Sequence, residues 1–156
     1  MVRRLSLALL LAGGLAACGV PEVRTVAPTP ETIAFLSLEP GAVAGCVDIE
    51  GAVVDGLAGM VTGNTEAAIA SQVQRGVERC GRLAGLIQPA RFQGAERVRA
   101  EACRTAFAGK VDAYTALSGA LAAEGDFVAA QSGARRFLSS LNEARPQMER
   151  CNTPVA

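Results

Sequence analysis

Three long stretches of the chain carry an apolar residue at every third or fourth position, and this spacing constrains the fold more than any other feature. In residues 65–87 the stripe consists of Ile69, Val73, Val77, Cys80, Ala84 and Ile87. In residues 95–123 it consists of Ala100, Cys103, Phe107, Val111, Tyr114, Leu117 and Leu121. In residues 127–151 it consists of Phe127, Ala130, Ala134, Phe137, Leu141, Ala144, Met148 and Cys151. Each stripe predicts a helix that must bury one face against a neighbour.

The connections between these three helices are short. Pro89 ends the first helix, residues 91–94 form the next turn, and residues 124–126 form the turn before the third helix. Helices joined by short turns pack antiparallel. The sequence therefore predicts an all-α fold, a small antiparallel three- or four-helix bundle. Pro146 predicts that the last helix is kinked or restarts at that point.

The chain before residue 64 gives weaker patterns. Residues 41–63 contain six glycines, and Val47, Val54, Leu57 and Val61 recur at helical spacing. They predict either a helix weakened by glycine or an irregular loop. Residues 32–38 form a short apolar run, which is typical of a strand or of a docking segment. Residues 19–30 are rich in proline and predict an extended tether.

The first eighteen residues have the organisation of a targeting segment. Arg3 and Arg4 precede a short apolar run, and Leu15-Ala16-Ala17-Cys18 follows it. This last motif resembles the lipobox of bacterial lipoproteins. The resemblance implies cleavage before Cys18, a diacylglyceryl thioether on its sulfur and an acyl chain such as palmitate on its amine. The alternative is an ordinary signal peptide with a chance cysteine.

The resemblance also implies a location and a division of the chain. Residues 1–17 are expected to be a cleaved signal peptide, residues 18–40 a lipidated proline-rich tether and residues 41–156 a helical domain. Acyl chains on Cys18 would hold the protein on a membrane. Gly19, rather than an aspartate, follows Cys18. In a Gram-negative cell we therefore expect the periplasmic face of the outer membrane.

Four cysteines remain once Cys18 is set aside, and an even number in an oxidising compartment predicts two disulfides. Two residues face each other across a helical hairpin when they are equidistant from its turn. By this criterion all four fall near one layer of a four-helix bundle: Cys46, Cys80, Cys103 and Cys151. We favour the pairs Cys80–Cys103 and Cys46–Cys151. The pairs Cys46–Cys80 and Cys103–Cys151 remain the alternative.

Several classes of active site are excluded or disfavoured by composition. The chain has no histidine, so no imidazole base, nucleophile pair or metal ligand is available. No C-x-x-C or C-x2-4-C pair occurs among the cysteines, which disfavours zinc and thiol-redox chemistry. The carboxylate pair Asp48 and Glu50 shows no apolar surroundings of the kind that acid–base catalysis needs. We expect no enzyme activity, no metal and no cofactor.

Charge gives one further candidate site. The formal net charge is zero, so no nucleic acid is expected as a partner. Five arginines nonetheless share helix faces and form a possible anion or partner contact: Arg75, Arg79, Arg82, Arg97 and Arg104. The alternative is a solvated face, because Glu78 and Glu101 lie within one helical turn of several of them.

These features together predict a membrane-anchored periplasmic lipoprotein. Its helical domain would act as a non-catalytic interaction or scaffold module of the cell envelope, with an envelope protein as partner. The alternative function is a carrier or sensor of a small apolar or anionic ligand bound between helices.

Overall fold

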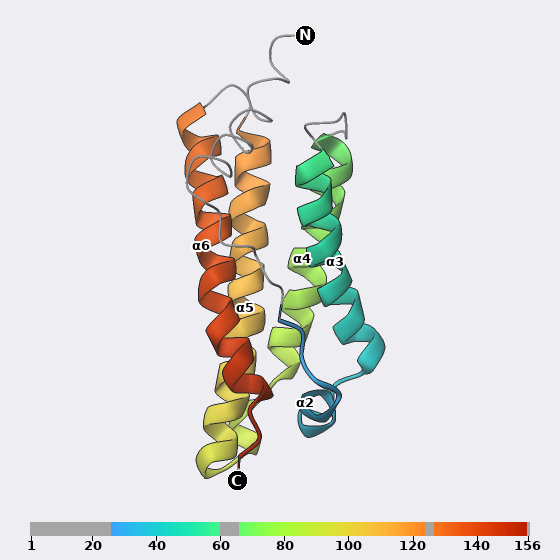
Figure 1. Ribbon diagram of the computed structural model, residues 1–156, viewed down its shortest axis with the longest axis vertical. Coiled ribbons are helices and arrows are strands. Elements are labelled where there is room, and N and C mark those ends of the chain that lie inside the picture. Colours follow the sequence, from blue (N-terminus) through green and yellow to red (C-terminus); the bar gives the residue numbers. More distant parts are fainter. Residues whose placement is uncertain (1–25, 60–65, 124–126, 156) are drawn as a thin grey trace.

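The computed structural model describes residues 26–59, 66–123 and 127–155, and within these ranges the chain is helical without any strand. Four long helices run antiparallel: α3 (Pro40–Gly59), α4 (Glu66–Leu86), α5 (Gly94–Ala122) and α6 (Phe127–Asn152). Figure 1 shows two hairpins side by side, α3 with α4 and α5 with α6. A 3-10 turn, η1 (Pro89–Arg91), connects the hairpins. The predicted all-α bundle is confirmed, with four helices.

A short helix, α2 (Pro30–Phe35), precedes the bundle and lies near the C-terminal end of α6 (Figure 1). Its start follows from the local sequence, because the Thr29 hydroxyl accepts a hydrogen bond from the Thr32 amide and Pro30 occupies the first turn. Its end is a Schellman motif in which Ser37 adopts φ 53°. The amides of Ser37 and Leu38 bond back to Ala34 and Ile33. Of the two possibilities for residues 32–38, the strand is wrong.

The core follows the predicted stripes. Phe107, Tyr114 and Leu117 of α5 are fully buried, and Val73 and Met148 pack in the same core from α4 and α6. The stripe members Val77, Ala84, Val111 and Leu121 are half-buried. The side chains of the stripe members Phe127, Ala130 and Ala134 lie outside the described residues.

Residues 40–59 form a regular helix, so the helical interpretation of residues 41–63 is confirmed up to Gly59. The face that it buries differs from the prediction. Val47 and Val54 are only half-buried, whereas the core face consists of Val43, Cys46, Ile49, Glu50 and Val53. Leu57 and Val61 lie outside the described side chains. In α6 the helix continues through Pro146, so the predicted restart does not occur.

Both disulfides form within hairpins. Cys46 of α3 is bonded to Cys80 of α4, and Cys103 of α5 is bonded to Cys151 of α6. The two predicted disulfides are confirmed, but the favoured pairing is wrong and the alternative pairing is correct.

The reason for this pairing lies in the spacing of the helices. Among the described residues, no Cα atom of α3 lies within 8 Å of one in α6. A bond between Cys46 and Cys151 would need two α-carbons closer than about 7 Å. Each disulfide therefore connects the two helices of one hairpin, and neither disulfide connects the hairpins to each other.

Candidate functional site

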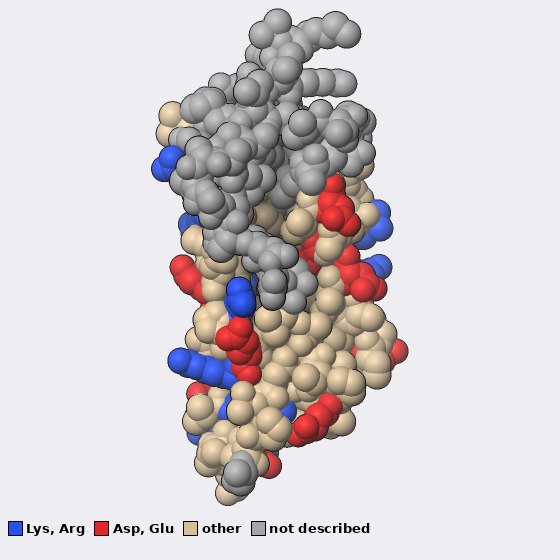
Figure 2. Space-filling view, in the orientation of Figure 1, with Lys and Arg blue, Asp and Glu red and all other residues tan. Residues whose placement is uncertain are grey.

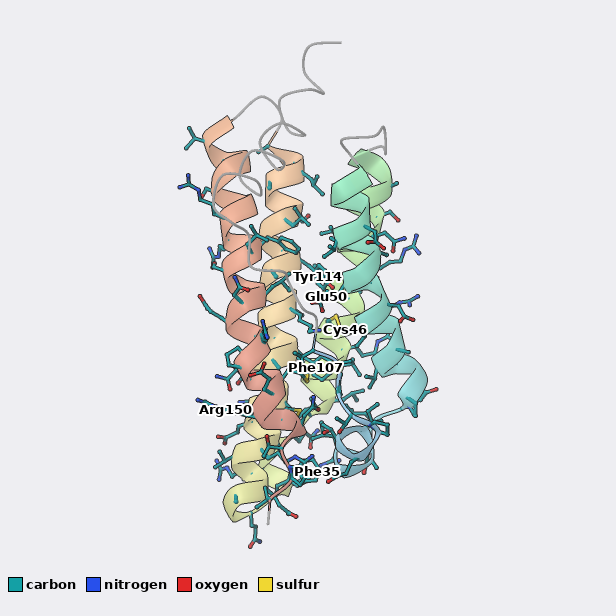
Figure 3. All side chains as sticks on the ribbon, viewed as in Figure 1. Phe35, Cys46, Glu50, Phe107, Tyr114 and Arg150 are labelled. Carbon is teal, nitrogen blue, oxygen red and sulfur yellow. A yellow bond between two sulfur atoms is a disulfide. The ribbon has the colours of Figure 1, made fainter. Side chains whose placement is uncertain are left out.

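The interior between the two hairpins contains a buried ion pair. Lys110 of α5 donates a hydrogen bond to Glu50 of α3, and each side chain is 4% exposed. Lys110 is the only lysine of the chain. Figure 3 shows Glu50 and Tyr114 in the interior, between α3 and α5. The pair bridges helices whose backbones are not in contact, so it links α3 to α5 through their side chains.

Glu50 corrects an expectation from the sequence. Its surroundings include the buried residues Ile49 and Val53 and not only solvent. A buried carboxylate is expensive unless it is paired, and Lys110 supplies the partner. The arrangement neutralises both charges, which is typical of a structural pair rather than of an acid–base catalyst. One signal in the sequence indicates the burial of Lys110, which lies three residues after Phe107 and four before Tyr114, on the core face.

Tyr114 lies one helical turn beyond Lys110 and is completely buried. Its hydroxyl has no hydrogen-bond partner among the described residues. Burial, with a further contribution from the Glu50 carboxylate, raises the pKa of the Tyr114 phenol well above its ordinary value. The ring packs on α4 at Gly76, where a Cβ atom would lie 2.7 Å from the ring. Tyr114 therefore acts as a core residue, as the sequence predicts.

A second buried cationic group, Arg99, joins α2 to the end of α6. Its Nε donates to the Cys151 carbonyl oxygen at 2.8 Å, and its Nη2 donates to the Thr32 hydroxyl at 3.1 Å. The guanidinium also stacks over the Phe35 ring at 4.4 Å, and Phe35 packs against Phe92. A cation at a helix C-terminus is favourable because the last carbonyls carry partial negative charge. Arg99 is not among the site residues predicted from the sequence.

Residues 26–29, which we name the strap, lie in an extended conformation over the gap between α3 and α6. The Asn152 side chain holds them with both ends of its amide. Its Nδ2 donates to the Ala27 carbonyl at 2.8 Å, and its Oδ1 accepts from the Thr29 amide at 3.0 Å. Pro28 is buried and Val26 is half-buried against the core. Part of the segment that the sequence assigns to the tether thus packs on the bundle.

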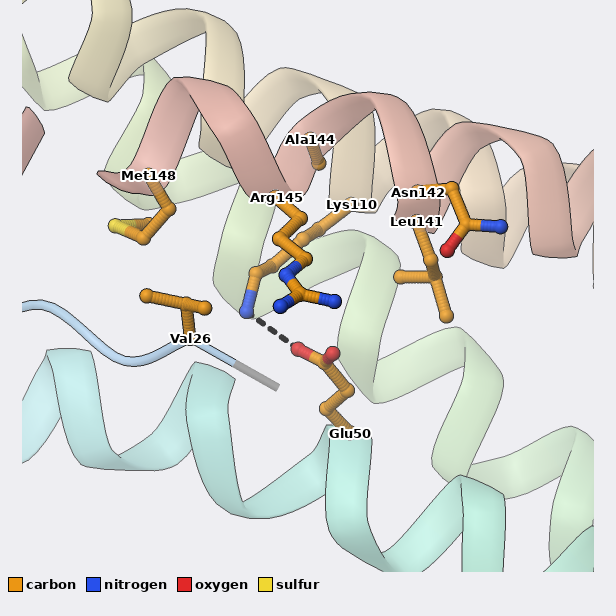
Figure 4. A pocket seen from close by; sticks show the side chains of 8 residues that line it. All are labelled: Val26, Glu50, Lys110, Leu141, Asn142, Ala144, Arg145 and Met148. Atoms are coloured by element: carbon orange, nitrogen blue, oxygen red, sulfur yellow. Dashed lines mark hydrogen bonds and ion pairs between the residues drawn. The ribbon is translucent and has the colours of Figure 1, made fainter. Parts of the chain in front are cut away.

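A small hollow lies under the strap (Figure 4). Val26 lines it together with Glu50, Lys110, Leu141, Asn142, Ala144, Arg145 and Met148. Its volume is about 10 Å³, which is room for roughly one water molecule. The hollow is therefore too small for a lipid or a metabolite, and it gives the ligand-carrier hypothesis no support.

The five predicted arginines all lie at the surface. Arg75, Arg79, Arg82, Arg97 and Arg104 are exposed. Arg97 pairs with Glu101 at 3.2 Å, and Arg75 bonds to Ser71. Arg79 lies along α3, where a Cβ atom on Gly45 would be 3.0 Å from its Nη1. On the face drawn in Figure 2, acidic and basic side chains are interspersed.

The structure offers no metal site within the ranges it describes, because no group of three potential ligands converges there. The described helices also include none that is long and apolar enough to cross a membrane. The predicted signal peptide and Cys18 lie outside the described residues.

Comparisons with known proteins found no similarity. No family model matches the chain, and neither the curated proteins nor the solved structures include a match.

Proposed function

We propose that the chain is a lipid-anchored envelope protein whose helical bundle is a non-catalytic interaction or scaffold module. The observation that carries the proposal is the Leu15-Ala16-Ala17-Cys18 motif behind a basic and then apolar leader. The two disulfides support it, since such bonds persist in oxidising compartments. In a Gram-negative cell the site of action would be the periplasmic face of the outer membrane.

The interior of the bundle supports a binding role for its surface rather than for a cavity. The large buried side chains fill the core, and the hollow beside Lys110 holds about one water molecule. The chain has no histidine, and the buried charged side chains of Glu50, Lys110 and Arg99 are engaged in structural contacts. What remains available to a partner is the outer surface of the helices. An envelope protein is the partner class that an anchored module of this kind would meet.

Lipidation is tested by Cys18→Ser, with Gly19→Ser as the matched control that keeps the cysteine. Cells are labelled with a palmitate analogue and then fractionated. The wild type and Gly19→Ser should incorporate the label and sediment with membranes, whereas Cys18→Ser should do neither. If Cys18→Ser still incorporates the acyl label, the anchor is not at this residue.

The interaction role needs a crosslinking strategy that does not depend on amines, because Lys110 is 4% exposed and is the only lysine. Photoreactive residues can instead be placed at Val98 and Val128, which are 66% and 73% exposed and lie on different helices. A probe at the fully buried Leu117 is the control. In intact cells at least one exposed probe should capture a discrete protein. If the probes at Val98 and Val128 both capture no more protein than the probe at Leu117, the result would count against a protein partner.

A further inference from the structure

We propose that the strap is a releasable latch. Residues 26–28 of the strap can detach while Thr29 stays in place as the N-cap of α2, and their release exposes the Glu50–Lys110 pair. The inference rests on the proposed function in one respect, namely that the chain preceding the strap leads to the membrane.

The first argument is that the strap and α2 are fastened with different strength. The two hydrogen bonds from Asn152 to the strap are exposed to solvent. Exposed bonds of this kind contribute little and open easily, because water replaces them. By contrast, Thr32 is 0% exposed, and its hydroxyl accepts a buried hydrogen bond from the Arg99 guanidinium. Bonds to a buried charged group are stronger and costlier to break. The Thr32 hydroxyl also donates to the Asn152 Oδ1, and Thr29 is bonded to the first turn of α2. Opening should therefore stop at Thr29.

The second argument is what the strap covers. Because α3 and α6 do not touch along their backbones, side chains and the strap close the seam between them. Val26 lines the hollow with Lys110 and Glu50, and Figure 4 shows it beside the Lys110 ammonium. Removing Val26 admits water to an ion pair that is otherwise shielded. The accessibility of the Lys110 amine therefore indicates whether the strap is bound or released.

The functional consequence is a change in reach. Release of residues 26–28 adds three residues to the free chain, which is roughly 9 Å at about 3.1 Å per extended residue. With the strap bound, the domain lies closer to its membrane anchor, and with the strap released it can lie further away. Tension along the chain favours the released state. The strap carries no charged side chain, so salt should affect the latch little.

The test measures acetylation of Lys110 by an amine-reactive reagent on the full-length mature protein in detergent. The rate is read by mass spectrometry from the peptide that contains Lys110. Asn152→Ala removes both strap bonds and also the bond that the Thr32 hydroxyl donates to Oδ1. Asn142→Ala, at an exposed asparagine that also lines the hollow, is the matched control. Loss of two exposed hydrogen bonds should speed acetylation about tenfold, whereas Asn142→Ala should resemble the wild type. Asn152→Asp, which loses only the donor to Ala27, should fall between them.

Two results overturn the proposal. One is an equal rate in Asn152→Ala and Asn142→Ala. The other is a faster rate accompanied by loss of amide protection throughout α5, because Lys110 would then report global unfolding.

Amide exchange on the wild type is an independent measurement that needs no variant. The Thr29 amide, which bonds to Asn152, should exchange well before the amides of Leu36 and Leu38. Equal protection of the three amides would contradict the latch. The intact mass of the same protein shows whether Cys18 carries acyl chains, so a failure of lipidation is distinguished from a failure of the latch.

Discussion

Gly133 of α6 lies against the backbone of α5, and its replacement by alanine tests this packing directly. A Cβ atom at this position would lie 2.7 Å from the Ala116 carbonyl oxygen and 2.8 Å from the Ala120 Cβ. It would also lie 3.1 Å from the Ala120 amide nitrogen. Because two of these obstacles are backbone atoms, no change of rotamer removes the clash. The two helices would have to move apart.

The size of the effect follows from two opposing terms. Overpacking of a well-packed interface costs about 1–3 kcal/mol. Replacing glycine by alanine inside a helix stabilises by about 1 kcal/mol. We therefore expect Gly133→Ala to lower the free energy of unfolding by up to about 2 kcal/mol. Gly119 of α5 is the matched control, because a Cβ atom there meets nothing within 4 Å. Gly119→Ala should stabilise by up to about 1 kcal/mol.

The assay is denaturant unfolding of the oxidised protein followed by circular dichroism, with the slope of each transition compared between variants. The two alanine variants should change the free energy of unfolding in opposite directions. If Gly133→Ala is as stable as Gly119→Ala, then α5 and α6 do not approach each other in the way the structure shows.

Further substitutions test the core. Glu50→Gln should destabilise by about 3–5 kcal/mol because it leaves a buried ammonium unpaired, whereas Glu50→Leu with Lys110→Met should be near neutral in the same unfolding assay. Tyr114→Phe should be neutral or stabilising at pH 7, since the hydroxyl has no partner. The raised pKa of Tyr114 means that its contribution to stability is complete below about pH 10 and is lost as pH rises further. Phenolate absorbance of this only tyrosine should therefore appear only with alkaline unfolding, and a normal titration near pH 10 in the folded protein would contradict its burial. Removing Cys46 and Cys80 should cost about 4 kcal/mol for a loop of 34 residues, and a non-reducing peptide map that links either to another cysteine would refute the pairing.

Much of the fold could be predicted from the sequence because the relevant information is local. The spacing from Cys103 through Phe107 to Tyr114 determines the buried face of α5 without reference to any other helix. The ends of the helices follow from glycine, proline and the short turns. The pairing of the cysteines could not be derived in this way, because symmetry about the turns places all four in one layer but does not say which helices touch. That depends on the gap between α3 and α6.

The buried polar groups were missed for a related reason. Pattern analysis assigns charged side chains to the solvent, which is correct for Arg97 and Arg104. Lys110 and Arg99 are exceptions because each meets a partner far away in the sequence, 60 and 52 residues distant. A charge on an apolar stripe indicates that such a partner must exist, since its burial is otherwise too costly. The stripe alone cannot identify Glu50 or the Cys151 carbonyl.

The distribution of covalent and non-covalent links determines where this domain should open first. Each disulfide staples one hairpin, Cys46–Cys80 in the first and Cys103–Cys151 in the second. Between the hairpins the structure relies on the packing of α4 against α5, on the ion pair, on the bonds that join α2 to Arg99 and to the end of α6, and on the strap. Constraints within a hairpin leave the free energy of separating the hairpins largely unchanged, because they act on each hairpin in both states. The seam between α3 and α6 has neither backbone contact nor a covalent bond, so local opening should begin there, at the place where the chain enters the bundle.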